Sequence, residues 1–340
     1  MGRKIFLLVG AILLLIACAG PEVQKKVDLV WPLPPEDPRI KYLRSYEGSK
    51  DVEEASSSEK LLTTLLGESE AGIGLGKPYG VYANKDRIIV TDTGIGKVVV
   101  FDKKNKKYFP IGLDGKGALS KPIGVAVDKE GITYITDTQQ DRVVAFDKDG
   151  KYSHVIGEKG TFTQPTGLAV NDNAGLIYVV DTNKHQLFIF KKDGTPVSII
   201  GQRGNGDGEF NFPTNVFVGK SGKVFVSDSM NFRVQIFDPD GKFLKKFGQV
   251  GDIPGMFSRP KGIAVDSDEN IYVVDSAFNN VQIFNGDGQL LLFFGEMGHK
   301  PGQFWLPAGM YIDDEDKIYV ADQYNQRINV FQYLNGKKAK

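Results

Sequence analysis

The chain of 340 residues is poor in the side chains that most often carry catalysis or bind transition metals. It contains one cysteine and three histidines. A single cysteine excludes an internal disulfide and any site built from several thiolates. The histidines, His154, His185 and His299, include no pair at the spacing of a zinc site. A nucleophile elbow, a phosphate-binding loop and a Cys/His pair are also missing from the sequence.

Excess charge and long apolar runs are lacking as well. Lysine and arginine number 42, and aspartate and glutamate also number 42. A nucleic-acid-binding chain usually carries a basic excess, so we expect no nucleic-acid partner. The one strongly apolar stretch, residues 5–16, is shorter than the roughly 20 residues that a membrane-spanning helix needs.

That apolar stretch is typical of a secretory signal, because Arg3 and Lys4 precede it. The residues Leu15-Ile16-Ala17-Cys18 resemble the lipobox of bacterial lipoproteins, in which the cysteine sulfur carries a diacylglycerol. The resemblance implies a signal peptide at 1–17 and a lipidated Cys18, and a stable membrane anchor. Ala19 then favours the outer membrane, with the protein facing the periplasm. The alternative is a free cysteine within a hydrophobic signal peptide.

The next segments connect the expected anchor to the folded part. Five prolines between residues 20 and 38 predict an extended spacer that cannot build a sheet, so we expect a tether at 18–38. Residues 40–46 alternate like a strand. Residues 51–66 read as a short helix with a leucine stripe and Gly67 as its stop. The segment 39–76 is therefore expected to hold one strand and a helix that docks on the domain or binds a partner.

Internal repeats decide the fold class. Landmarks of one unit recur six times, 43 to 48 residues apart: Pro78, Pro122, Pro165, Pro213, Pro260 and Pro307; Asp92, Asp137, Asp181, Asp228, Asp275 and Asp322; and Phe101, Phe146, Phe190, Phe237, Phe284 and Phe331. Each unit holds about four short strands separated by Gly, Asp and Asn turns. Four strands at this period indicate the blades of a β-propeller. A Leu or Phe three residues before each proline is expected to fill the gap between blades.

Segments such as Asn231-Phe232-Arg233-Val234-Gln235-Ile236-Phe237, together with Pro-x-Gly-x-Ala-Val-Asp and Ile-Tyr-Val-x-Asp, resemble NHL repeats. The resemblance covers residues 77–331 and is weakest in blades one and three. It implies an all-β, six-bladed propeller at 77–336, followed by a basic tail at 337–340. Because the last unit lacks an outer strand, we expect residues 40–46 to complete it and close the ring.

The loop after the second strand of each blade and the loop joining blades should lie on one face, where propellers usually bind. The candidates there are Ile95, Gln140, Lys184, His185, Asn231, Phe232, Phe278, Asn279, Tyr324 and Asn325. Aromatic residues carry much interface energy, which favours a binding surface. The alternative is that these side chains only cap solvated turns.

The six recurring aspartates could form a calcium-binding ring. Since they repeat in every blade, a turn-stabilising role is favoured, with backbone N–H groups or the basic residue five positions on as partners. NHL-like lyases depend on histidines in or near the channel, and gluconolactonase-like propellers use a Glu, Asn or Asp residues and a divalent cation. Asn215 stands where other blades have glycine and could face the channel.

These observations predict a non-enzymatic, lipid-anchored periplasmic binding or scaffold protein without a cofactor. Its partner would be a protein or ligand held on one propeller face, with Phe232, Phe278, Tyr324, His185, Gln140 and Asn215 as candidate contacts. The alternative is a metal-dependent hydrolase or lyase, lactonase-like, acting in the central channel with a divalent cation. Its cheapest test is whether a chelator lowers the melting temperature.

Overall fold

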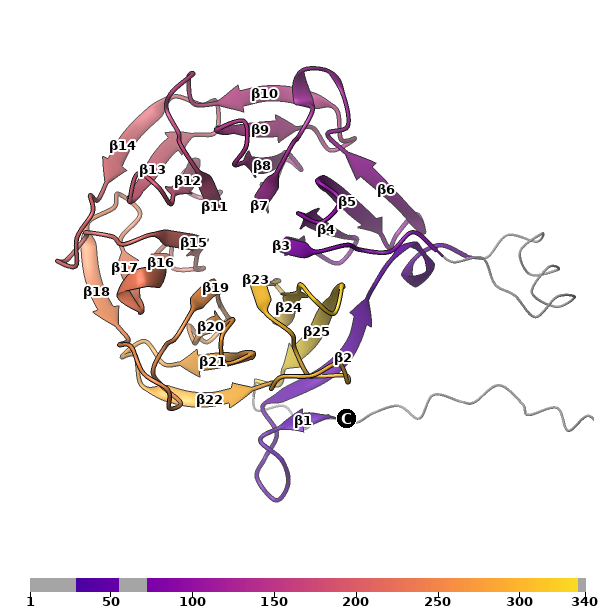
Figure 1. Cartoon of the computed structure of the whole chain (residues 1–340), viewed down its shortest axis with the longest axis vertical. Helices are drawn as coiled ribbons and strands as arrows, with labels where there is room; N and C mark the ends of the chain where they lie inside the picture. Colours follow the sequence, from indigo (N-terminus) through magenta and orange to yellow (C-terminus); the bar gives the residue numbers. More distant parts are fainter. Residues whose placement is uncertain (1–28, 55–71, 336–340) are drawn as a thin grey trace, which may run out of the picture.

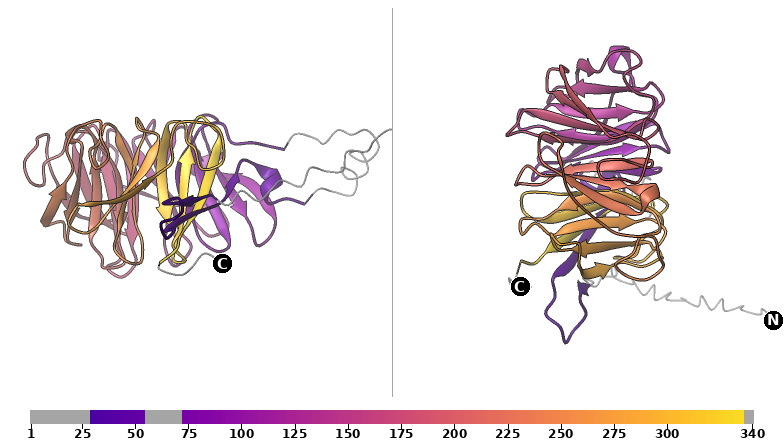
Figure 2. Two further views of the ribbon diagram at one scale, coloured as in Figure 1. Left: turned by 90° about the horizontal axis from the view of Figure 1, so that it is seen from below. Right: turned by 90° about the vertical axis from the view of Figure 1, so that its left-hand side faces the viewer.

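The computed structural model describes residues 29–54 and 72–335, which form six small antiparallel sheets around a central axis (Figure 1). Seen from the edge, the ring is a disc with loops on both of its faces (Figure 2). The predicted signal peptide at 1–17, the lipidation site Cys18 and the basic tail at 337–340 lie outside the described residues.

Blades one to five each contain four strands that follow one another from the axis outward. Blade one consists of β3 (Pro78–Ala83), β4 (Arg87–Asp92), β5 (Lys97–Asp102) and β6 (Lys107–Ile111), and blade two of β7 (Pro122–Val127), β8 (Thr133–Asp137), β9 (Arg142–Phe146) and β10 (Tyr152–Ile156). Blade three consists of β11 (Pro165–Asn171), β12 (Leu176–Asp181), β13 (Gln186–Lys191) and β14 (Pro196–Ile200), and blade four of β15 (Pro213–Val218), β16 (Val224–Asp228), β17 (Arg233–Phe237) and β18 (Phe243–Phe247). Blade five consists of β19 (Pro260–Val265), β20 (Ile271–Asp275), β21 (Asn280–Phe284) and β22 (Leu290–Phe294). Blade six begins with β23 (Pro307–Ile312), β24 (Lys317–Asp322) and β25 (Arg327–Tyr333).

The ring is closed by a strand from the other end of the chain, as the sequence predicts. Strand β2 (Ile40–Tyr46) pairs antiparallel with β25, from Ile40 opposite Tyr333 to Tyr46 opposite Ile328. Ile40, Tyr42 and Tyr46 are buried against blade six and its neighbours. Pairing of this kind covers the free edge of β25 and joins the two ends of the described chain.

The end of the proline-rich segment departs from expectation. Val30 and Trp31 form strand β1 (Val30–Trp31), which pairs with β2 and makes a fifth strand of blade six. The expectation that the proline-rich tether at 18–38 cannot join a sheet is therefore wrong at Val30 and Trp31. The physical reason is that the prolines after Trp31 lie in the turn to β2, where they remove no donor from the ladder. The Trp31 ring packs 5.8 Å from the rings of Phe294 and Phe331.

The core lies between blades, which explains why the middle strands are apolar on both sides. Every residue of β20 and β21 is buried, whereas the first four residues of the outermost strand β22 alternate between partly buried and exposed. Phe210, Phe257 and Phe304 fill the blade junctions, as predicted from their position before each proline, and none has any exposed surface. Such close packing between neighbouring blades fixes where each inner strand meets the axis.

The predicted helix at 51–66 falls mostly in residues 55–71, outside the described part of the chain. The described residues before it form a single 3-10 turn, η1 (Ser49–Asp51). Among the described residues, no helix is long and apolar enough to span a membrane. Short 3-10 turns also occur at η2 (Gly115–Gly117) and η3 (Ser229–Asn231).

Candidate ligand-binding face

Antiparallel blades place two kinds of loop on each side of the disc. Loops between the second and third strands, and loops between blades, share one side, which also bears the six recurring aspartates. We call this side the aspartate face. The loops between first and second strands, and between third and fourth strands, form the opposite face.

The recurring aspartates hold the loops of the aspartate face in place. The side-chain oxygens of Asp92 accept N–H bonds from Gly76 and Lys77, both at 2.7 Å. The side chain of Asp275 likewise accepts bonds from the backbone N–H groups of Ser258 and Arg259. All six aspartates are fully buried. Their saturation by loop N–H groups supports the turn-stabilising interpretation over a calcium ring.

The predicted pairing of these aspartates with the basic residue five positions on holds in two blades. Arg233 and Arg327 donate from Nε to Asp228 at 2.8 Å and to Asp322 at 3.0 Å. Burial raises the pKa of both carboxyls, and bonds from backbone, amide and guanidinium groups oppose that effect. In blade two the guanidinium of Arg142 donates instead to the carbonyls of Lys116 and Ala118.

Several predicted contact residues are engaged within the protein. His185 is 7% exposed, and its Nδ1 accepts a 3.0 Å bond from the Phe212 N–H. Burial, followed by the nearby Arg203, lowers the pKa of His185, which keeps the imidazole neutral and able to accept that bond. Gln140 is exposed, but its amide donates to the Ala118 carbonyl and the Ser120 hydroxyl.

The predicted aromatic residues differ in how far they reach solvent. Phe232 and Phe278 are half-buried, and Phe232 packs against the core between blades four and five. Tyr324 is 46% exposed. Its ring lies 5.4 Å from the ring of Trp305, which is in turn 5.0 Å from the imidazole of His299. Tyr324 is therefore the predicted aromatic residue best placed to contact a ligand.

Basic residues that sequence reasoning overlooked surround the channel on this face. The Lys77 ammonium lies 4.8 Å from the Tyr324 ring centre, and the Lys261 ammonium lies 5.5 Å from the Tyr79 ring centre. Burial, then Arg259 and Lys77, lowers the pKa of Lys261 to about 8. Burial raises the pKa of Tyr79 to about 12. The sequence does contain a signal for these basic residues: the positions beside each recurring proline differ from blade to blade, whereas the prolines themselves repeat.

The central channel holds a cavity of about 100 Å³ lined by the inner strands of all six blades. Asn215 lies in its wall, as predicted, and its buried Nδ2 has no hydrogen-bond partner among the described residues. Tyr82 and Tyr311, with ring centres 4.8 Å apart, also line it. The other lining residues are glycines and apolar side chains, so the wall offers amide and phenol groups without the carboxylates that a lactonase-like metal site needs.

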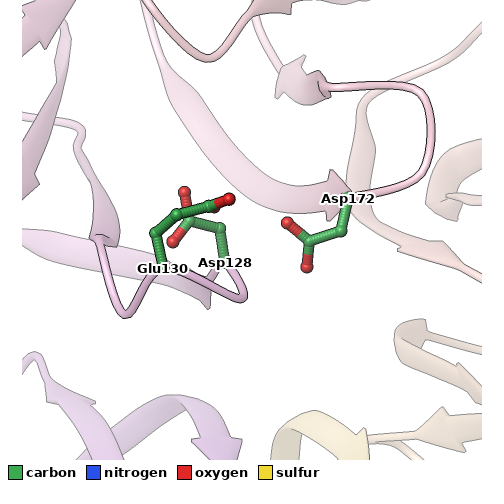
Figure 3. A group of neighbouring side chains, drawn as sticks. All are labelled: Asp128, Glu130 and Asp172. Carbon is green, nitrogen blue, oxygen red and sulfur yellow. The ribbon is translucent and has the colours of Figure 1, made fainter.

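One trio of carboxylates in the described part of the chain is close enough to hold a metal ion, and it lies on the opposite face. Asp128, Glu130 and Asp172 each have an oxygen within 4.8 Å of the others, and Figure 3 shows Asp172 reaching toward the adjacent pair Asp128 and Glu130. The Lys192 ammonium lies 2.7 Å from Glu130 and 3.3 Å from Asp128, and it also contacts Asp172. The three carboxylates raise the pKa of Lys192. An ammonium thus supplies the positive charge that a bound cation would.

Two family models match parts of the chain. Residues 164–224 and 220–280 match a family described as a 6-bladed beta-propeller, and residues 304–331 match the NHL repeat. This protein is a six-bladed β-propeller, and its sixth blade contains one match to the NHL repeat. No curated protein matches the chain significantly in sequence.

Solved structures extend the likeness of this six-bladed propeller over most of the chain. A Bacteroides thetaiotaomicron protein of unknown function is 18% identical, with a TM-score of 0.62, covering 86% of this chain and 75% of its own. An auxiliary nutrient binding protein from the same organism is 17% identical, with a TM-score of 0.60 and coverage of 76% and 70%. Virginiamycin B lyase from Staphylococcus aureus is 16% identical, with a TM-score of 0.57 and coverage of 75% and 94%. At these identities the likeness establishes the fold alone.

Proposed function

We propose that this propeller is a non-enzymatic binding or scaffold protein of the bacterial cell envelope, which holds its partner on the aspartate face. The observation that carries this proposal is the group formed by Tyr324, Trp305 and Lys77. An exposed tyrosine packs beside a tryptophan, and both residue types are enriched among those that dominate binding energy at interfaces. The ammonium over the tyrosine ring adds a cation–π contact.

The rest of the molecule agrees with a role in binding. Backbone N–H groups anchored on buried aspartates hold the loops that display Lys77 and Trp305, so the face is rigid before it meets a partner. Among the folds it resembles is an auxiliary nutrient binding protein. The lipobox-like residues ending at Cys18 support attachment to a membrane, with an outer-membrane position facing the periplasm as the favoured destination.

Site-specific crosslinking in the native membrane tests the proposal. A photoreactive residue in place of Tyr324 should capture a defined partner, whereas the same residue in place of Lys220, exposed on the opposite face, should not. A double variant that carries the photoreactive residue at position 324 and the substitution Trp305→Ala should capture no partner. Tyr152→Ala, which removes an exposed aromatic ring from the outer strand β10, should leave capture unchanged. Equal capture from both faces would contradict the proposal.

The alternative, a metal-dependent hydrolase or lyase, is supported by Asn215. Its unpartnered amide in the channel wall could contact a substrate, and the fold resembles that of virginiamycin B lyase. Asn215→Gly restores the residue that the other blades carry at this position. If the alternative is correct, this variant abolishes lactonase or lyase turnover by the purified protein, while its melting temperature stays close to that of the wild type.

A further inference from the structure

The residues beside the six recurring prolines carry charge of one sign only. At the twelve positions that directly precede or follow these prolines there are four basic residues and no acidic ones: Lys77, Lys121, Arg259 and Lys261. The prolines begin the inner strands, so these positions surround the mouth of the channel on the aspartate face (Figure 1). Three of the four basic residues belong to blades five and one, which lie on either side of blade six.

Lys261 is the most unusual of the four because it is half-buried and has no anionic partner. No salt bridge to its ammonium occurs among residues 29–54 and 72–335. The titratable groups facing it are Arg259, at the start of its own blade, and Lys77 and Tyr79 of blade one. A desolvated ammonium beside two other cations costs free energy in the unliganded protein. A bound anion would offset this cost.

The opposite end of the channel carries the reverse charge. The six loops that join first and second strands contain eleven acidic and four basic residues, and Asp128, Asp172 and Asp314 are among the acidic ones. These three carboxylates lie near Tyr82 at that end and contribute, after burial, to the raised pKa of its phenol. Charge of opposite sign at the two mouths steers an anion to the aspartate face and away from the other side.

Aromatic rings of blade six lie beside the basic residues at this mouth of the channel. The Lys77 ammonium is 3.5 Å from the Tyr324 hydroxyl, and the Tyr324 ring packs beside Trp305 at a tilt of 36°. A flat or sugar-like ring could cover these side chains while a charged group attached to it reaches Lys261. Because Lys261 is half-buried within the mouth, a small group can approach it more closely than a folded protein surface can.

We propose that the mouth of the channel on the aspartate face binds a small acid, a molecule whose carboxylate or phosphate group contacts Lys261, Arg259 and Lys77 while its body lies against Trp305 and Tyr324. This inference rests on the proposed function and specifies the chemical class of the ligand.

Matched pairs of probes test the proposal on the whole purified protein by thermal shift and calorimetry. Glucuronate and glucose 6-phosphate should each raise the melting temperature, whereas glucose, which has the same ring without the charge, should not. Lys261→Met keeps the length of the side chain and removes its charge, and it should weaken glucuronate binding at least tenfold. The control Lys220→Met, in an exposed loop of the opposite face, should bind glucuronate like the wild type.

The pH dependence gives a readout that a merely structural role would not change. Glucuronate keeps its charge between pH 7 and 9, while the Lys261 ammonium loses its proton near pH 8. The affinity of the wild-type protein for glucuronate should therefore fall severalfold over that pH range, whereas the affinity of Lys261→Met should stay nearly constant.

Three outcomes would overturn the inference: glucose binding as tightly as glucuronate, neither anionic probe binding, or binding that is confined to an acidic peptide. Crosslinking at position 324 separates this failure from failure of the proposed function. If the Lys261→Met variant still captures the partner, the proposed binding function is supported and the small acid as its ligand is refuted. If glucuronate binds but no partner is crosslinked, the small-acid ligand is supported and the scaffold role is refuted.

Discussion

At the scale of single residues, His185 shows how a residue that looks functional in sequence can be structural. Its buried imidazole accepts a backbone N–H bond only when neutral, and its positive φ of 56° holds it in a tight turn. The side chain thus joins two loops of the aspartate face. Its Nδ1 is therefore engaged within the fold.

This arrangement predicts a loss of stability at acidic pH. The pKa of His185 is lowered in the folded protein, so the unfolded chain binds more protons below about pH 6.5, and the stabilisation declines as pH falls through that value. Between pH 7.5 and 5.5 the wild type should lose about 1–2 °C more in melting temperature than His185→Asn, since asparagine tolerates the same backbone conformation. Equal losses in both proteins would contradict this assignment.

Lys261 predicts the opposite sign of pH dependence. Its folded pKa of about 8 lies below its unfolded value, so the charged side chain destabilises the fold below pH 8, and the penalty disappears as pH rises toward 10.5. Lys261→Met should therefore melt about 1–3 °C higher than the wild type at pH 7, with the difference shrinking by pH 10. Scanning calorimetry at both pH values measures it; a less stable variant at pH 7 would show that the side chain supports the fold through packing.

At the scale of elements, the cluster of Asp128, Glu130 and Asp172 spans blades two and three and depends on a single cation, Lys192 of blade three. Lys192→Ala would leave three carboxylates facing one another, and we expect a loss of about 1–2 kcal/mol, modest because the cluster is partly exposed. Millimolar Ca²⁺ should restore much of this stability in the variant, because the remaining oxygens suit a hard cation. Calcium should change the wild-type melting temperature far less, and equal shifts in both proteins would refute the expectation.

Strand β2 is the element on which the ring most depends. Deleting 39–48 would expose the edge of β25 and remove three buried side chains, Ile40, Tyr42 and Tyr46, each worth about 1.5–3 kcal/mol. Because that sum rivals the whole stability of a typical domain, we expect a sharp fall in melting temperature. Deleting only 29–37, which removes β1, should cost much less, since it leaves the pairing of β2 with β25 intact. A 39–48 deletion that melts like the parent would disprove closure through β2.

At the scale of the whole molecule, the two candidate functions differ in what a chelator should do. A binding protein that needs no divalent cation should melt at the same temperature with and without EDTA. A channel enzyme whose metal binds only the folded state should lose several degrees when that metal is removed. Protein purified without chelators, then divided and scanned in both conditions, provides the measurement. A loss that is reversed by one added cation would favour the enzyme.

The repeats made the architecture predictable. The site was harder to predict because its residues come from different blades, which meet only in the closed ring. Landmarks such as Asp228 and Phe237 recur because every blade must satisfy the same packing and loop geometry, so one sequence reveals them. Strand β1 was missed because it has two residues and lies among prolines. Lys261 and Tyr79 are separated by 182 positions, and only the closed ring places them together. The side chains of Gln140 and His185, candidates taken from loop position alone, proved to be bonded to neighbouring loops of the fold.

Closure of the ring by β2 also sets the order in which this chain can mature. Ile40 pairs with Tyr333, so nearly three hundred residues separate the partners of the final seam. Strand β2, made early in synthesis, must wait for the last blade, and the entropy of bringing such distant segments together slows that step. Until the seam forms, blade six exposes an unpaired edge. The chain is therefore most vulnerable to proteolysis and to pairing with other chains while that edge is open.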